Sequence, residues 1–358
     1  MTFVSVVGAR PQFIKSAPVS SAIARAGGMD EFVVHTGQHF DVTMSGLFFD
    51  QLNLIPPSAQ LDIHGGTHGS MTGRMLQALE EVMLNVRPDA VLVYGDTNST
   101  IADALAASKL HIPVAHVEAG LRSFDRRMPE EVNRIVTDHI SDFLYCPTRS
   151  AVENLKSEGR THPRAHVELV GDVMLDASLL FRNAAMPPRQ SKIPEQFILA
   201  TAHRAENTDN PAALTQIVSA LTTIHQQVLP VVMPVHPRTA KALHATGLDL
   251  GVIRLNPVGY LEMLWLLEHA SAVVTDSGGL QKEAYFFEKP CITMRMSTEW
   301  TELVEEGVNV LVGVDAEQIV AETKRSITIR VTPSGSPYGD GQAANRIAHS
   351  MQGAFGSA

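Results

Sequence analysis

The chain has 358 residues, of which 44% are hydrophobic, and it carries a formal net charge of −10. This length exceeds what one hydrophobic core organises, so we expect two domains. The negative charge argues against nucleic acid or an anionic membrane as a partner, because either is bound through a basic patch. The low aromatic content of 6% is typical of buried parallel strands under small-residue helices, which indicates an α/β protein.

The sequence begins with MTFVSVVGARP, which has no basic leader and is typical of a first β-strand rather than a signal peptide. No uninterrupted run of about 18 apolar residues occurs, so no membrane span is expected. We therefore expect a cytoplasmic protein. The two cysteines, Cys146 and Cys291, each end an apolar run and are expected to be buried thiols.

Short apolar runs alternate with amphipathic segments from the start of the chain. The strands predicted in the first half cover residues 3–7, 32–35, 90–94, 114–117 and 143–146. Segments 97–110 and 130–140 between them have helical periodicity. This alternation predicts a doubly wound, Rossmann-like domain over residues 1–165.

A second series of strands follows the polar stretch SEGRTHPRAH. Its predicted strands cover residues 167–170, 197–201, 231–235, 252–255, 272–275 and 291–294. They predict a second Rossmann-like domain over residues 166–340, with the Pro-rich segment 183–194 as a surface connection inside it. A last helix, over about residues 341–358, is expected to pack back onto the first domain.

Carboxylates follow the predicted strands of the first domain, at the sheet edge where open α/β proteins bind ligands. Asp96 and Glu118 each end a strand, and Glu130 starts a helix shortly afterwards. Asp96 has an alternative role as a helix N-cap, and Glu130 has one as the ion-pair partner of Arg134. If these three carboxylates lie in one cleft, the pKa of at least one of them would be raised. Together they would then supply an acid and a base near neutrality.

Phosphate-binding patterns occur in both halves. The segment GARPQFIK places Arg10 and Lys15 around a helix start, although it could also be an ordinary strand-to-helix turn. The segment VTDSGGLQKEA gives the stronger signal, because residues 277–279 directly precede a helix whose amides suit a diphosphate. Glu283 lies one turn into that helix, where it can accept hydrogen bonds from ribose hydroxyls.

Histidines follow two strands of the second domain. His203, with Arg204, and His236 occupy equivalent positions, which favours a functional role over a structural one. His64 and His68 have a spacing of four, but the glycines between them disfavour a helix, so we predict no metal site. No dinucleotide fingerprint follows a strand, and we expect no cofactor.

The motifs GARPQFIK, TGQH, YGDTNST, HVEAGLRS, PEEVNR, HRAEN, HP and DSGGLQKEA occur in this order between about Val4 and Gly313. Together they resemble the non-hydrolysing UDP-N-acetylglucosamine 2-epimerases. The resemblance implies a glycosyltransferase-B fold, with the active site in a central cleft between two Rossmann-like domains, and a homodimer. It also implies an isomerase reaction on a UDP-sugar: a base removes the C2 proton, UDP leaves from C1, and UDP re-adds after protonation on the opposite face.

The resemblance gives each candidate residue a role. Asp96, Glu118 and Glu130 would handle protons and the sugar, with His203 as a further catalytic residue. The residues that it assigns to the diphosphate, the sugar and the ribose are Arg10, Lys15, Arg134, His236, Ser277, Gly278, Gly279 and Glu283.

Three departures from the family pattern bear on the substrate. Ala205 replaces an arginine in HRAEN, residues 298–302 read TEWTE in place of TERPE, and the segment 60–76 is more elaborate. The TEWTE and HGGTHG features resemble the branch that converts UDP-2,3-diacetamido-2,3-dideoxy-glucuronate to its mannuronate epimer for surface polysaccharide such as O-antigen. The candidates for contact with its extra carboxylate and acetamido groups are Arg74, Arg295, Trp300 and His68.

A second ligand site and several alternatives follow from the same resemblance. Gln38, His39 and Arg204 match residues that line an activator site for UDP-N-acetylglucosamine, but the missing guanidinium at Ala205 argues against activation here. The alternative functions are a UDP-N-acetylglucosamine 2-epimerase, a hydrolysing 2-epimerase, a glycosyltransferase of the same fold and a catalytically silent binding protein.

Overall fold

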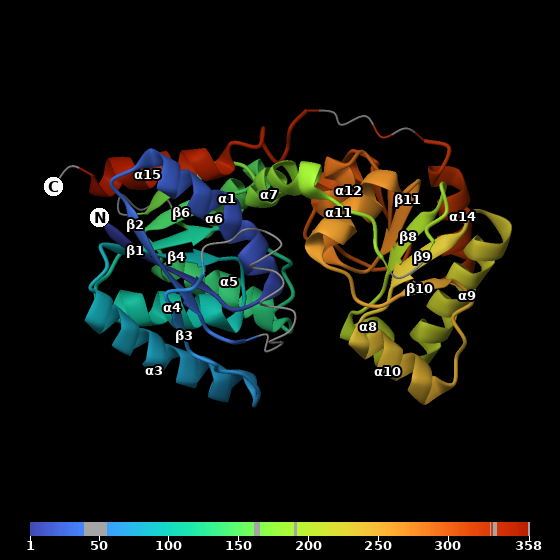
Figure 1. Ribbon diagram of the computed structural model, residues 1–358, viewed down its shortest axis with the longest axis horizontal. Helices are drawn as coiled ribbons and strands as arrows, with labels where there is room; N and C mark the ends of the chain where they lie inside the picture. The colour runs from blue at the N-terminus through green and yellow to red at the C-terminus, as the bar shows by residue number, and fades with distance from the viewer. Residues whose placement is uncertain (39–55, 161–164, 190–191, 330, 332–334, 357–358) are drawn as a thin grey trace. The chain divides into compact units, whose positions relative to one another are not determined.

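The computed structural model describes residues 1–38, 56–160, 165–189, 192–329, 331 and 335–356. The chain forms two compact units, drawn in Figure 1. Unit 1 comprises Met1–Leu180 and Ser336–Ala358, and unit 2 comprises Phe181–Gly335. The division therefore falls later in the chain than the boundary predicted at residue 165.

Unit 1 is built on a seven-stranded parallel sheet in the order β3-β2-β1-β4-β5-β6-β7. Its strands are β1 (Thr2–Val7), β2 (Asp30–His35), β3 (Ala59–Gln60), β4 (Ala90–Tyr94), β5 (Val114–Val117), β6 (Phe143–Cys146) and β7 (His166–Leu169). The order reverses between β1 and β4, which pair in parallel. In open α/β sheets this switch point is where ligands bind, beyond the carboxyl ends of the strands.

Helices cover both faces of this sheet (Figure 1). They are α1 (Arg10–Ala26), α3 (His68–Val86), α4 (Asn98–Lys109), α5 (Pro129–Ile140), α6 (Arg149–Ser157), α7 (Val173–Phe181) and α15 (Ala343–Phe355). Alternate residues of β1 enter two different cores, as the pleat of a strand requires. Phe3 packs in a core with Ile347 of α15, and Val6 packs in another with Leu79 of α3.

β7 and α7 extend unit 1 beyond the predicted boundary at residue 165, whereas α15 packs onto unit 1 as expected. β7 pairs with β6 and completes the first sheet, whereas we expected it to open the second. β7 can pair there because β6 would otherwise have an unpaired edge. The sequence did not predict this pairing because β7 is short and its residue pattern does not indicate which sheet it joins. α15 lies along α1 (Figure 1), and the Asp176 carboxylate of α7 accepts hydrogen bonds from the amides of Ala343 and Ala344.

Unit 2 repeats the strand order of unit 1 in a six-stranded sheet, β10-β9-β8-β11-β12-β13. Its strands are β8 (Ile198–Thr201), β9 (Val231–Pro234), β10 (Ile253–Leu255), β11 (Ala272–Thr275), β12 (Cys291–Thr293) and β13 (Asn309–Leu311). β13 was not predicted. The switch point of this sheet lies between β8 and β11, which pair in parallel.

The helices of unit 2 bury one core that spans α9, α14 and the sheet. They are α8 (Ala205–Thr208), α9 (Pro211–Gln227), α10 (Pro237–Thr246), α11 (Tyr260–His269), α12 (Gly278–Phe286), α13 (Thr301–Glu305) and α14 (Ala316–Ser326), and a 3-10 turn covers Arg182–Ala184. Leu221 of α9 and Ile319 of α14 are fully buried against Val274 of β11. This packing places the loops after β8 and β11 next to each other.

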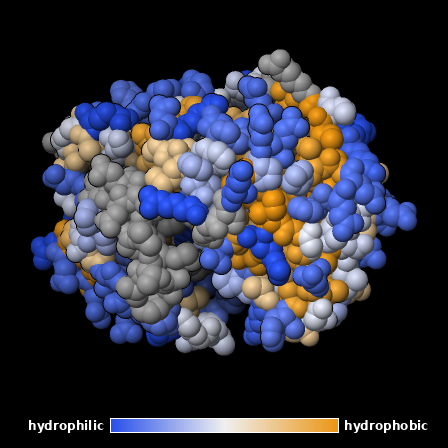
Figure 2. All heavy atoms as spheres, turned by 45° about the vertical axis from the view of Figure 1, so that its right-hand side comes forward, coloured by the Kyte–Doolittle hydropathy of each residue, from blue (hydrophilic) through white to orange (hydrophobic). Residues whose placement is uncertain are grey.

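The surface mixes polar and apolar side chains, as Figure 2 shows for one face. The most exposed large apolar side chains are Met296, at 88%, and Phe124, at 79%. Each lies in a loop that follows a strand, β12 for Met296 and β5 for Phe124. Within the described residues, no helix is both long enough and apolar enough to cross a membrane.

Candidate active site

Carboxylates and cations meet in pairs at the switch point of unit 1. Asp96 follows β4 and Glu118 follows β5, while Arg10 starts α1. The Lys15 ammonium of α1 donates to Glu118 Oε1 at 2.8 Å. Arg134 Nη1 of α5 lies 3.4 Å from Asp96 Oδ2. Asp96 and Glu118 therefore each face a cationic side chain from a neighbouring helix.

The setting of Asp96 shifts its pKa. Burial raises the pKa of Asp96 above its ordinary value, and the nearby charges of Arg134 and Lys15 oppose this rise. The carboxylates of Glu118 and Glu130 raise the pKa of Asp96 further, so all three acids lie close enough to interact. A carboxyl group in such surroundings can accept and release a proton nearer neutrality than a solvated one.

The two neighbouring carboxylates of α5 lie in different surroundings. Glu131 is buried, and its Oε2 accepts hydrogen bonds from the amide and the hydroxyl of Ser123. Arg134 Nη2 lies 3.2 Å from the same oxygen. Arg134 thus pairs with Glu131 and Asp96 rather than in the predicted alternative with Glu130, which is exposed. No role was predicted for Glu131, which holds the loop after β5 against α5.

Gln12 holds the loop after β1. Its Oε1 accepts hydrogen bonds from the amides of Gly8 and Ala9, at 2.8 and 3.0 Å. Its Nε2 donates to the carbonyl oxygen of Tyr94 at 2.9 Å and to Thr100 Oγ1 at 3.1 Å. These loop amides are therefore engaged within the protein. Gln12, for which no role was predicted, ties together the two loops of the switch point.

Four further candidates of unit 1 were assigned to the activator site or to sugar specificity. One of them, His68, has its Nδ1 3.1 Å from Asn98 Nδ2. Gln38 Oε1 accepts from the amide and hydroxyl of Ser99, at 3.0 and 2.8 Å. Arg74 Nη2 donates to the carbonyl oxygen of Gly65 at 2.6 Å, so this guanidinium folds back onto its own loop. His39 lies outside the described residues.

Asp276 organises the switch point of unit 2. Its carboxylate is buried and accepts hydrogen bonds at 3.0 Å from the amides of His203 and Arg204 and from Asn207 Nδ2. Burial lowers the pKa of His203 despite the nearby Asp276, which favours the neutral imidazole at pH 7. The rings of His203 and His236 lie 5.4 Å apart. Asp276 was part of a predicted motif but had no predicted role.

α12 begins next to this carboxylate. Ser277 precedes the helix, and its amide donates to Thr275 Oγ1 at 2.9 Å. A Cβ atom at Gly278 would overlap the Glu299 carboxylate, so any larger residue here would require the Glu299 side chain to move. The first amides of a helix and its dipole suit an anion. Glu283, one turn further, is 7% exposed.

The TEWTE segment packs against the first turns of α12. Trp300 is 4% exposed and donates its indole N–H to the carbonyl oxygen of Gly278 at 3.0 Å. The Lys282 ammonium lies 4.1 Å from the centroid of the indole ring. Arg295 Nη1 donates to Glu299 Oε2 at 2.9 Å. Trp300 is thus a buried support of α12, and Arg295 pairs with Glu299 of the TEWTE segment; the expected contact of both residues with extra groups on the sugar stays a prediction.

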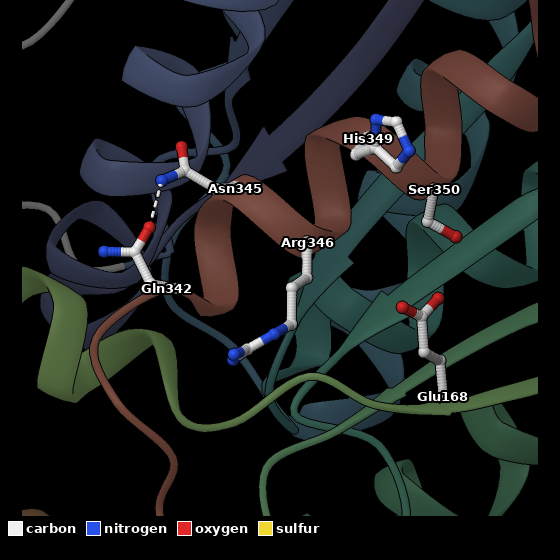
Figure 3. A pocket seen from close by; sticks show the side chains of 6 residues that line it. All are labelled: Glu168, Gln342, Asn345, Arg346, His349 and Ser350. Carbon is white, nitrogen blue, oxygen red and sulfur yellow. Dashed lines mark hydrogen bonds between the residues drawn. The ribbon is translucent and has the colours of Figure 1, made fainter.

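A separate pocket of about 380 Å³ lies in unit 1 between β7 and α15 (Figure 3). Its lining consists of Glu168, Gln342, Asn345, Arg346, His349 and Ser350. The Arg346 guanidinium donates to the carbonyl oxygen of Val170 and to Asp340, each at 2.9 Å. The hydrogen bond from Arg346 to Val170 fastens α15 to the segment after β7, and none of the lining residues was a predicted site residue.

Two units of the same strand order, each with charged residues at its switch point, define an α/β enzyme of the glycosyltransferase-B fold class. Residues 21–352 match the family model of UDP-N-acetylglucosamine 2-epimerase. The chain therefore belongs to the UDP-N-acetylglucosamine 2-epimerase family, and it is an isomerase.

Similar proteins cover nearly the whole chain. A Pseudomonas aeruginosa protein named UDP-2,3-diacetamido-2,3-dideoxy-D-glucuronate 2-epimerase is 57% identical over 97% of this chain and 98% of its own. The crystal structure of Methanocaldococcus jannaschii UDP-GlcNAc 2-epimerase with UDP-GlcNAc and UDP is 39% identical, with a TM-score of 0.87 over 98% of this chain and 99% of that one. The Neisseria meningitidis enzyme bound to UDP-GlcNAc is 28% identical, with a TM-score of 0.89 over 99% and 100%.

Proposed function

We propose that this enzyme inverts C2 of UDP-2,3-diacetamido-2,3-dideoxy-D-glucuronate by eliminating and re-adding UDP. The observation that carries the reaction type is the pairing of Asp96 with Arg134 and of Glu118 with Lys15 at one sheet edge. The substrate is supported by the 57% identity to the Pseudomonas aeruginosa protein of that name.

The carboxylates of unit 1 carry the proton steps in this proposal. A carboxylate takes the proton from C2, the electron pair forms a C1–C2 double bond, and the bond from C1 to the UDP oxygen breaks. Asp96 suits the return of a proton to the opposite face, because burial and two neighbouring acids raise its pKa. The positive charges of Lys15 and Arg134 offset the negative charges of the carboxylates beside them during the proton transfer.

Unit 2 holds UDP in this proposal. The amides of Gly278 and Gly279 at the start of α12 and the His236 ring face the diphosphate, whereas the amide of the preceding Ser277 donates to Thr275 Oγ1. Glu283 accepts hydrogen bonds from the ribose hydroxyls. A departing diphosphate needs stabilisation, which helix-terminal amides and cations provide. His203 is placed beside His236 and serves as a further acid–base group in its neutral form. Arg10 supplies positive charge from the start of α1.

A second candidate substrate is UDP-N-acetylglucosamine. It is favoured by the 39% identity to the Methanocaldococcus jannaschii enzyme, whose crystal structure contains this nucleotide sugar. The hydrolysing alternative and the transferase alternative give different products. The former releases a free amino sugar and UDP, and the latter leaves its donor intact without an acceptor.

Proton NMR in deuterated water tests the proposal with the two UDP-sugars in separate tubes. We expect deuterium at C2 and a manno product with the diacetamido-glucuronate, and much slower exchange with UDP-N-acetylglucosamine. Exchange with UDP-N-acetylglucosamine alone would refute the substrate, and an intact C2 proton in both tubes would refute the epimerase reaction. A free sugar as the first product would favour the hydrolysing alternative.

Variants of the paired carboxylates test the roles of the residues. Asp96→Asn and Glu118→Gln are each expected to lower kcat by about 100- to 10,000-fold, the usual contribution of a positioned acid or base. Glu153→Gln on α6 is the matched control, because Glu153 is exposed and lies outside the paired groups. An unchanged rate in both site variants would revive a silent nucleotide-sugar-binding protein.

Further features of the proposal follow from the family. We propose a homodimer that works in the cytoplasm and supplies a sugar for a surface polysaccharide. Arg204 lies 3.9 Å from Glu299 and donates to the carbonyl oxygen of Asp276, and Ala205 beside it lacks a guanidinium. We therefore expect equal rates on the diacetamido substrate with and without added UDP-N-acetylglucosamine. A rate increase on addition would support the activator site.

A further inference from the structure

A polar network that is buried except at Glu158, whose side chain is 27% exposed, adjoins the turns that carry the carboxylates of unit 1. It joins His116 in β5, Asp138 in α5 and Arg122 in the loop after β5, all of whose side chains are at most 1% exposed. Glu158, at the end of α6, completes it through two hydrogen bonds of 2.7 Å from the Arg122 guanidinium. Groups that are buried this deeply are costly unless every charge is paired.

The hydrogen bonds of His116 define its protonation. Nδ1 lies 2.7 Å from Asp138 Oδ1, and Nε2 lies 2.7 Å from the carbonyl oxygen of Gly95. A carbonyl oxygen can only accept a hydrogen bond. Burial alone would raise the pKa of Asp138, but the bond from His116 and the charge of Arg122 hold it below its ordinary value. Asp138 Oδ2 accepts from an arginine and from a backbone amide, which is the pattern of a carboxylate, so both ring nitrogens of His116 face acceptors, a pattern that an imidazolium satisfies.

The second carboxylate oxygen of Asp138 connects the network to the loop after β5. Oδ2 accepts from the amide of Gly120 at 3.1 Å and from Arg122 Nη1 at 2.6 Å. Two cations and two carboxylates then balance inside unit 1. The buried thiol of Cys146 lies near the same groups, and burial raises its pKa, so it adds no charge. The network is neutral as a whole and needs no counterion from solvent.

The atoms that this network holds flank the two proposed catalytic carboxylates. Gly95, whose carbonyl His116 binds, directly precedes Asp96 and has φ of +63°. Gly120, whose amide Asp138 binds, lies two residues after Glu118 and has φ of +81°. Glu118 itself has φ of +75°, a conformation that costs a non-glycine residue about 1–3 kcal/mol and persists only where surrounding contacts impose it.

We propose that His116, kept as an imidazolium by Asp138, is a positioning residue for Asp96 and Glu118. It links the left-handed turns after β4 and β5, so the two carboxylates keep a fixed separation through the proton steps. A shift of about 1 Å in such groups costs about 100-fold in rate. This inference rests on the proposed function for its kinetic part, whereas the protonation of His116 is independent of it.

Two variants and a matched control test the inference. His116→Phe removes both hydrogen bonds, and Asp138→Asn removes the charge that keeps the second ring proton. The control His139→Gln changes a neighbouring exposed histidine whose Nδ1 contacts only the carbonyl oxygen of Ile135 in the same helix. We expect kcat to fall about 10- to 100-fold in His116→Phe, with KM for the UDP-sugar within threefold. Rates are compared below the melting temperature of each variant.

The nitrogen-15 NMR signals of the ring provide a readout that a merely structural role would not move. We expect two ring N–H protons on His116 in the wild-type chain at neutral pH, one in Asp138→Asn, and no change in His139→Gln. A single ring proton in the wild type, or a His116→Phe variant that folds and keeps a wild-type kcat, overturns the inference. If the wild type turns over neither UDP-sugar, the proposed function fails while the NMR result still decides the state of His116.

Discussion

Replacing Trp300 tests how unit 2 holds the start of α12. Trp300→Phe removes the indole N–H that donates to Gly278 at 3.0 Å and weakens the contact with Lys282 at 4.1 Å. An intramolecular hydrogen bond contributes about 0.5–1.5 kcal/mol net, and a desolvated cation–π contact contributes about 2 kcal/mol. We expect Trp300→Phe to lower the free energy of unfolding of unit 2 by about 1–2 kcal/mol. Trp300→Leu, which also leaves a cavity, should lower it by about 3 kcal/mol or more.

Urea unfolding followed by tryptophan fluorescence measures this effect. The chain has two tryptophans, Trp265 and Trp300, and both lie in unit 2, so the signal reports that unit. Trp265→Phe is the control, because Trp265 is partly exposed and stacks on His269 at its own helix end.

A double-mutant cycle isolates the contact with Lys282. Combining Lys282→Met with Trp300→Leu should give a coupling energy of about 1–2 kcal/mol. Strictly additive effects, within about 0.3 kcal/mol, would refute the idea that the buried ammonium is stabilised by the indole ring.

Three further predictions concern Asp103, Gly278 and His203. Asp103 is fully buried in α4, and burial raises its pKa well above the ordinary value of 3.8. The native state therefore keeps the proton on Asp103, and its stability falls as the pH rises from 3.8 through the native pKa. Asp103→Asn should therefore stabilise the chain increasingly between pH 4 and 8 in thermal unfolding, and a constant difference would count against this. Gly278→Ala should lower the stability of unit 2 through contact with Glu299, whereas Gly279→Ala meets no atom within 4 Å and should not, as urea titrations can show. Because burial lowers the pKa of His203 below 6.5, the acid limb of kcat/KM that depends on it should lie below that pH and vanish in His203→Asn.

The sequence patterns predicted the repeated architecture well because most of the strands are apolar runs that end in a polar loop. They were weaker for short strands. β7 is half-exposed and only four residues long, so its pattern does not say which sheet it joins. β13 has three residues and no distinctive run, and its assignment rests on pairing with β12.

Neighbouring side chains in one motif were hardest to separate. Glu130 and Glu131 are adjacent acids, and only the phase of α5, set by its start at Pro129, turns the second one inward. Glu131, Arg134 and Asp138 recur at spacings of three and four, so a buried polar stripe on this helix was open to prediction. The burial of the Trp300 side chain could not be predicted. It depends on the close approach of the TEWTE segment to Gly278, and these residues are separated in the sequence.

The interrupted course of unit 1 has a consequence for the order of synthesis. Unit 2 is one continuous segment and can complete its core as soon as its last strand and helix have left the ribosome. Unit 1 cannot, because Ala344, Ile347 and Met351 of α15 are buried in its core yet are translated only after all of unit 2. A nascent chain therefore exposes the apolar face around Phe3 until α15 has been synthesised.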